Sequence, residues 1–126
     1  METWRNVWRE GIVPLLPLKG LKTLLKALQT DDPKLLQGLT TSTPKPNRPV
    51  EAACVIGFCG WRGAGLKTVT KVENFFKRVC KKANQLLGEP NKTNEFIGWH
   101  DTTPRAEMIQ ELLPEVKRAI AQKGEK

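Results

Sequence analysis

The chain has 126 residues, with 21 Lys and Arg against 13 Asp and Glu, so its formal net charge is +8. This length suits one domain with a modest core, and 39% hydrophobic with 27% charged residues is typical of a folded chain rather than a disordered one. Three cysteines, an odd number, argue against a disulfide framework and favour a reducing compartment. The surplus of positive charge predicts an anionic partner, either nucleic acid or anionic lipid.

The N-terminus lacks the pattern of a secretion signal. It reads METWRNVWRE, with acids and tryptophans where a signal peptide has a basic start and a plain apolar run. The apolar stretch over residues 12–18 is broken by Pro14 and Pro17 and is too short to span a bilayer. We therefore expect a cytoplasmic protein without a transmembrane segment.

Residues 1–38 are predicted to form an N-terminal helical arm. Trp4 and Trp8 share one face of a short helix over residues 2–10, which is expected to end at Gly11. Tryptophans this early in a chain anchor a terminus on the core or present an aromatic face to a partner.

A second helix is predicted over residues 18–29, because leucines recur on one face and lysines on the other. Asp32 as N-cap and Pro33 as first helical residue predict another helical turn, closed by Gly38. A basic amphipathic helix either docks a partner or membrane surface, or faces the core with a solvated lysine edge. The candidate partner-binding residues of the arm are Trp4, Trp8, Lys19, Lys22 and Lys26.

Residues 39–48 are predicted to be a linker loop, since prolines and hydroxyl residues dominate them. Residues 49–126 then form the helical core of what is one domain overall. The apolar segment 49–61 suits a buried helix by its Pro49 and alanine pair, or a strand over residues 50–58 by its β-branched residues. We predict the helix, and therefore a mainly α, compact small helical domain; the alternative is an α+β fold. The glycines at positions 57, 60, 63 and 65 predict a turn after this segment.

The clearest helix is predicted over residues 70–87. Thr70 and Glu73 have the spacing of a capping box at its start, and Gly88 is expected to end it. We expect this helix to pack between the 49–60 segment and the last helix of the chain.

The remaining residues are predicted to be a loop and one more helix. A short extended piece is expected over residues 95–99 within the loop 89–101. Thr103 before a proline predicts an N-cap, and Pro114 predicts a kink or a restart in the final helix.

Positive charge is concentrated away from the final helix. Residues 1–48 and 49–100 each hold eight Lys and Arg against four acids, whereas residues 101–126 hold five of each. On the helix over 70–87 the cations form one face, which can follow a phosphate backbone while tryptophans stack on bases. A solvated helix face is the alternative interpretation. The candidate nucleic-acid-binding residues are Trp61, Arg62, Lys67, Lys71, Asn74, Arg78, Lys81, Lys82 and Trp99.

Residues 60–68, GWRGAGLKT, imitate a phosphate-binding loop. Such a loop needs its second glycine directly before the lysine, and here Leu66 separates Gly65 from Lys67. Nucleotide hydrolysis is therefore not expected. A looser arrangement, in which Arg62 joins the lysine and a helix N-terminus, would hold one backbone phosphate.

The three cysteines and the single histidine have the composition of a structural zinc site, but not its spacing. Cys54 and Cys59 are five residues apart and diverge on a helix or a strand alike, so we expect no metal and no cofactor. Buried cysteines are the simpler expectation. A Cys59–His100 nucleophile pair, with Arg62 lowering the thiol pKa, is an alternative. The candidate metal ligands are Cys54, Cys59, Cys80 and His100, and the candidate catalytic residues are Cys59 and His100.

Four fragments carry a resemblance to other proteins: LLQGLTTSTP, VEAACVIGFCGW, GWHDTTPRAEM and LLPEVKRAI. They resemble short uncharacterised bacterial proteins of the kind found in cyanobacteria, over most of the chain from about residue 18. The resemblance implies a bacterial cytoplasmic setting, without an activity or functional residues.

These features predict a small basic, non-enzymatic, nucleic-acid-associated protein or an accessory subunit of a larger assembly. One alternative is a protein-interaction or regulatory module that uses the N-terminal tryptophan and leucine helices. The other is an enzyme that uses Cys59 and His100.

Overall fold

The structure, a computed structural model, describes residues 3–42, 45 and 47–124. Within these residues it contains six α-helices and isolated β-bridges but no strand. The predicted mainly α fold is confirmed, and the α+β alternative is wrong. Positions 43, 44 and 46 of the predicted linker lie outside the described residues.

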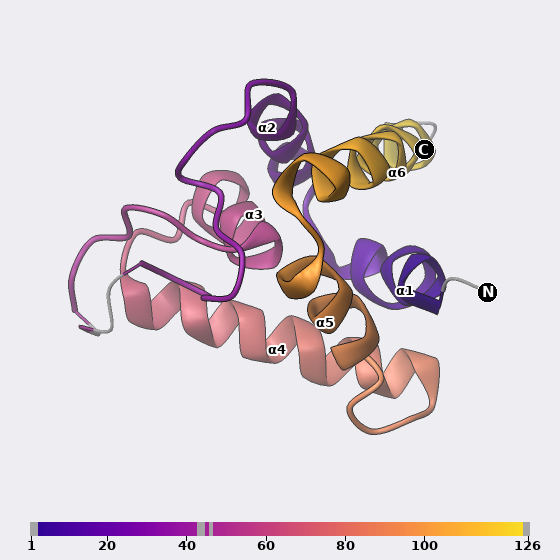
Figure 1. Ribbon diagram of the computed structural model, residues 1–126. Coiled ribbons are helices and arrows are strands. Elements are labelled where there is room, and N and C mark those ends of the chain that lie inside the picture. Colours follow the sequence, from indigo (N-terminus) through magenta and orange to yellow (C-terminus); the bar gives the residue numbers. More distant parts are fainter. Residues whose placement is uncertain (1–2, 43–44, 46, 125–126) are drawn as a thin grey trace.

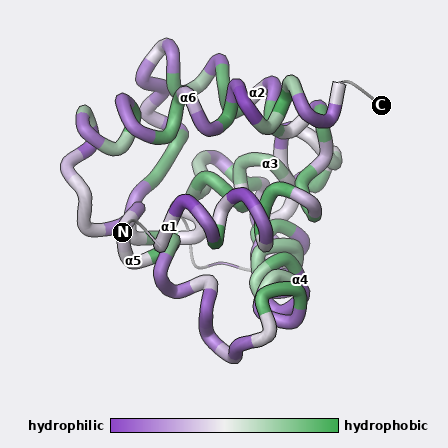
Figure 2. Tube along the Cα trace, turned by 90° about the vertical axis from the view of Figure 1, so that its right-hand side faces the viewer, coloured by the Kyte–Doolittle hydropathy of each residue, from purple (hydrophilic) through white to green (hydrophobic). Residues whose placement is uncertain are grey.

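Six α-helices and two short helical turns follow one another along the described part of the chain. They are α1 (Thr3–Asn6), the π-helical turn η1 (Val7–Ile12), the 3-10 turn η2 (Val13–Leu15), α2 (Leu18–Gln29), α3 (Val55–Gly63), α4 (Val69–Leu87), α5 (Asn94–Thr102) and α6 (Arg105–Gly124). Helices α2 and α6 pack side by side, α4 lies at the opposite side of the molecule, and α1, α3 and α5 lie between them (Figure 1). The hydrophobic helix α3 is in the interior (Figure 2).

The N-terminal helical turns belong to the main hydrophobic core. Trp4 and Trp8 are 4% and 0% exposed, and the second ring stacks on Phe96 of α5 at 5.2 Å between centroids. The predicted end at Gly11 is wrong, because η1 and η2 continue the helical path to Leu15. A Cβ on Gly11 would lie 2.7 Å from Leu87 Cδ1, so this glycine allows close packing on α4.

Helix α3 is the buried centre of the fold. The predicted helix over residues 49–61 is correct only from Val55 onward, since Ala53 and its neighbours are extended and pair with residues 34–42. Cys54 is the N-cap, and its Sγ accepts from the Gly57 N–H at 3.4 Å. The predicted glycine turn is wrong for three of its members, which lie inside α3; of the four, the one beyond the helix is Gly65, with a φ of +73°.

The glycines of α3 bring three helices into close contact. A Cβ on Gly63 would lie 2.4 Å from the backbone of Gly20 in α2. A Cβ on Gly60 would lie 2.6 Å from the ring of Phe75 in α4. Hydrogen in place of a side chain therefore lets α3 fit between α2 and α4.

The N-cap of α4 lies two residues before the predicted one. The Thr68 hydroxyl, and not that of Thr70, is the N-cap acceptor and receives the Lys71 N–H at 3.3 Å. Gly88 ends the helix in the left-handed region with a φ of +74°, as predicted. The predicted packing of α4 against the last helix is wrong: α4 packs on α3 and η1, because the N-terminal segment occupies that side, and α6 packs on α2.

Three further local predictions differ from the structure. Asp32 begins a turn rather than a helix, since its carboxylate accepts from the Lys34 N–H at 2.9 Å. Residues 95–99 are helical in α5, because Phe96 faces the N-terminal tryptophans and burial there overrides the β propensity of its neighbours. Of the kink or restart predicted at Pro114, the restart is wrong, since α6 runs through this residue without interruption.

The prediction that Thr103 is the N-cap of the final helix is wrong, because this residue is the C-cap of α5. Its hydroxyl donates to the Trp99 carbonyl at 2.5 Å and so caps the end of α5. The backbone bonds of α6 begin with the Met108 N–H donating to the Pro104 carbonyl at 2.8 Å.

Candidate nucleic-acid interface

The outward side of α4 carries a continuous row of exposed cations, called here the α4 cationic face. Its members are Lys71, Lys77, Arg78, Lys81 and Lys82, all exposed, and exposed Asn74 lies among them. Because α4 is buried along its opposite side by Val72, Phe75 and Val79, the face is held rigidly toward solvent. Lys71, Arg78 and Lys82 are about 10 Å and 6 Å apart along the axis, a pitch that suits successive phosphates of a chain.

The α4 cationic face is not neutralised within the described part of the chain. None of its five side chains forms an ion pair with a described residue. The one acid of α4, Glu73, is half-buried and accepts a hydrogen bond from the Thr41 hydroxyl at 3.2 Å. The positive potential along α4 is therefore open to an external anion.

Two further cations lie at the start of α4. The backbone of residues 48–50 pairs with that of residues 67–69: the Val69 N–H donates to the Arg48 carbonyl, and the Val50 N–H to the Lys67 carbonyl, both at 2.9 Å. Both Arg48 and Lys67 are exposed. Lys67 is predicted from the sequence, whereas Arg48 is not, because its proximity to α4 depends on a nonlocal backbone pairing. Lys77 is not predicted either, although the spacing of four residues to Lys81 could have revealed it.

The predicted aromatic contributors stack on other side chains of the protein. Trp99 of α5 stacks on Trp4 with centroids 3.6 Å apart and planes 5° from parallel. Trp61 of α3 is covered by Arg62, whose guanidinium carbon lies 4.2 Å from the ring centroid. Arg62 also lines a hollow with Thr23 and other residues of α2, and Lys67 is not among the residues that line this hollow.

A groove lies between the second half of α4 and the start of α5, and is called here the α4–α5 groove. It has a volume of about 640 Å³, and its apolar floor contains Phe76, Cys80 and Ile97. Lys77 and Lys81 of the α4 cationic face form one rim. The polar amide residues that also line it are Asn84, Gln85, Asn91 and Asn94.

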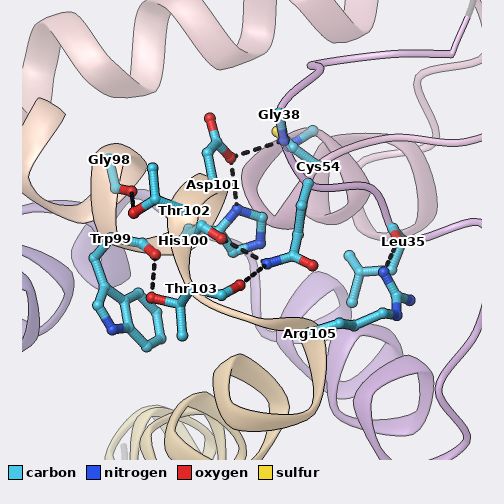
Figure 3. A network of polar contacts seen from close by, with 12 residues as sticks. Leu35, Gly38, Cys54, Gly98, Trp99, His100, Asp101, Thr102, Thr103 and Arg105 are labelled. Atoms are coloured by element: carbon cyan, nitrogen blue, oxygen red, sulfur yellow. Dashed lines mark hydrogen bonds and ion pairs between the residues drawn. The ribbon is translucent and has the colours of Figure 1, made fainter.

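His100 belongs to a network that fixes the connection between α2 and α3 (Figure 3). Its Nδ1 lies 3.0 Å from Asp101 Oδ1, and the same oxygen accepts from the Gly38 N–H at 2.9 Å. The Gln37 amide donates to the carbonyls of His100 and Thr103 at 2.7 and 2.8 Å, where α5 ends. This hydrogen bonding gives both residues 100 and 101 a structural role.

The cysteines occupy buried or half-buried positions. Cys59 is fully buried against Gly20, and burial raises the pKa of its thiol well above the ordinary value. Cys54, rather than Cys59, lines a small cavity of about 80 Å³ with His100, and burial raises its pKa to about 12. Such a thiol is not ionised at neutral pH, and ligand pockets usually measure several hundred Å³. Cys80 is half-buried, and burial also raises its pKa.

The structure also places the predicted metal ligands and the predicted partner-binding residues. Among the described residues, no group of three or more His, Cys, Asp or Glu could hold a metal ion. Trp4 and Trp8 are core residues and are not accessible to a partner, whereas Lys19, Lys22 and Lys26 are exposed on α2.

Within the described helices, none has the length and apolar character that crossing a bilayer requires. Comparison of the chain with protein-family models, with curated proteins and with solved structures finds no match. Function is therefore inferred from the geometry and charge of the surface.

Proposed function

We propose that this protein binds nucleic acid, with the α4 cationic face contacting the phosphate backbone. The observation that carries the proposal is a rigid helix with five exposed cations that make no ion pair with a described residue. Phosphate contacts of this kind provide affinity and orientation but not base specificity, because every nucleotide carries the same charge.

The distribution of acids supports an interface on α4 rather than on α6. On α6 the carboxylate of Glu115 is engaged by Arg9, at 2.8 and 2.7 Å from Nε and Nη2, so charges there neutralise one another. Arg48 and Lys67 extend the positive surface beyond the start of α4. A nucleic-acid chain lying along α4 would therefore meet cations from Arg48 and Lys67, at the start of the helix, to Lys82.

The test is a pair of charge reversals measured by fluorescence anisotropy with a labelled oligonucleotide at low salt. Arg78→Glu with Lys82→Glu is expected to weaken binding by about tenfold to a hundredfold, because two phosphate contacts become repulsive. Both side chains are exposed, so thermal unfolding should be little changed.

Lys117→Glu with Arg118→Glu is the matched control. These two residues are exposed on α6, and the double variant changes the net charge by the same amount. It should bind nearly as tightly as the natural protein. Equal weakening by the two double variants would mean that net charge alone, and not the α4 cationic face, drives the binding, and would overturn the proposal.

A further inference from the structure

We infer that the α4–α5 groove receives an unstacked base, so that the preferred ligand is a single-stranded nucleic acid. The inference rests on the proposed function and assigns a second role to the same surface. Two of the five cations of the α4 cationic face, Lys77 and Lys81, form a rim of this groove. A phosphate held by that rim would place the attached nucleotide over the groove.

The floor of the groove has the properties of a stacking surface. Phe76 is only half-buried and lies beside Ile97 and Cys80, so an aromatic ring and two apolar groups are available. Single-stranded nucleic-acid proteins gain much of their base affinity from aromatic side chains that lie beside a basic track. The groove, at about 640 Å³, is within the usual range for small-ligand sites.

The rest of the rim has groups that can hydrogen-bond to a base edge. Asn91 and Asn94 are exposed, and a side-chain amide presents both donors and an acceptor. Glu89 also lines the groove, and its carboxylate is paired with Lys92 at 2.9 Å, which lowers its repulsion of an anion; Lys92 also lies 2.8 Å from Glu95. A flat, partly polar base with a phosphate beside it matches this combination better than an acidic peptide, whose carboxylates would leave the apolar floor uncovered.

The thiol of Cys80 allows occupancy of the groove to be measured directly. This thiol lines the floor, whereas Cys54 and Cys59 are 8% and 0% exposed and should resist alkylation in the folded protein. The rate of iodoacetamide labelling at Cys80, followed by mass spectrometry, therefore reports occupancy of the groove. The two probes are a twelve-nucleotide oligothymidylate and an abasic chain with the same phosphates.

The natural protein is expected to bind oligothymidylate about tenfold more tightly than the abasic chain, as stacking of a base on an aromatic ring predicts. Oligothymidylate should slow Cys80 labelling several-fold, and the abasic chain should not at equal occupancy. Phe76→Leu should remove the preference between the probes and leave the abasic affinity unchanged. If this variant does not fold, the protection of Cys80 from labelling in the natural protein still tests the inference.

The possible outcomes distinguish the groove inference from the proposed binding of phosphates by α4. Equal affinity for both probes with unprotected Cys80 would overturn the groove inference while leaving phosphate binding by α4 intact. Absence of binding to either probe would overturn both. Competition by a duplex or by polyglutamate as effective as that by oligothymidylate would show that the surface recognises charge alone, and would also overturn the inference.

Discussion

Individual charged residues in this protein have two different roles, which their surroundings distinguish. Glu115 of α6 is only 6% exposed and lies under Arg5 and Arg9 of the N-terminal segment, so it connects the two ends of the chain. Lys71 and Arg78 of α4 are exposed and have no such partner among the described residues. Buried, paired charges of the first kind fix the fold, whereas exposed and unpaired charges of the second kind are available to a ligand.

The pairing of Glu115 predicts a pH dependence of stability. Its hydrogen bonds to Arg9 hold the pKa of the carboxyl below the ordinary value, so the folded state keeps the charge at a lower pH than the unfolded state does. This contribution is present above the unfolded pKa of about 4.3 and is lost as the pH falls through the lower folded pKa.

Glu115→Gln should therefore lower the melting temperature at neutral pH, and its difference from the natural protein should shrink below about pH 4. The measurement is a series of thermal unfolding curves by circular dichroism across this pH range. Glu107→Gln, at an exposed position on the same helix, is the control and should change little. A difference for Glu115→Gln that stays constant down to pH 2 would contradict the assignment.

At the scale of secondary structure, the helices pack closely where glycine allows two of them to meet. Gly20 and Gly63 face each other at the crossing of α2 and α3, and Gly60 receives the Phe75 ring at the crossing of α3 and α4. Because α3 joins the two sides of the molecule, strain at either crossing is transmitted to α4 and its exposed face.

Gly63→Ala is expected to destabilise the protein by about 1–3 kcal/mol, because its new methyl group would overlap the backbone of α2. Gly98→Ala in α5 is the control: nothing lies within 4 Å of its new Cβ, and helix propensity predicts a stabilisation of about 0.5–1 kcal/mol. Urea unfolding of both variants measures the two effects. Opposite signs are predicted, and a stabilising Gly63→Ala would show that α2 and α3 are not in close contact.

The elements that local sequence determines were predicted well. The 3.6-residue period of apolar residues defined α4, and Gly88 ends this helix as the sequence predicted, in the left-handed conformation. The glycines of α3 were taken for a turn because their function is close approach to Gly20 and Phe75, which lie far away in the sequence. The same limit explains why residues 95–99 were predicted as extended.

The candidate site was likewise predictable only where helical spacing determines it. Lys71, Arg78 and Lys82 follow from helical spacing alone, and the structure places all three at the surface of α4. The base-stacking role predicted for Trp99 did not anticipate its stacking on Trp4, because these two residues lie far apart in the sequence. The α4–α5 groove could not be predicted either, since it requires the turn after Gly88 to bring α5 back beside α4.

At the scale of the whole molecule, exposed cations lie on two sides: five on α4, and Lys19, Lys22 and Lys26 on α2. Helices α2 and α6 form one side, where α6 is paired with the N-terminal arginines, and α4 forms the opposite side (Figure 1). Five of the cations that produce the net charge of +8 lie on the outward side of α4. The larger group of cations, on α4, would therefore attract an anionic polymer more strongly than the three lysines of α2.

The salt dependence of single-strand binding tests this account most directly. For single strands, the logarithm of the association constant falls with the logarithm of salt concentration by about 0.7 per neutralised phosphate, so the five cations of α4 predict a slope of up to about −3.5. Arg78→Gln with Lys82→Gln should make the slope shallower by about 1.4, and Lys117→Gln with Arg118→Gln should leave it unchanged. A slope near zero in the natural protein, or one that the α4 substitutions leave unchanged, would contradict the central claim that α4 contacts the phosphate backbone.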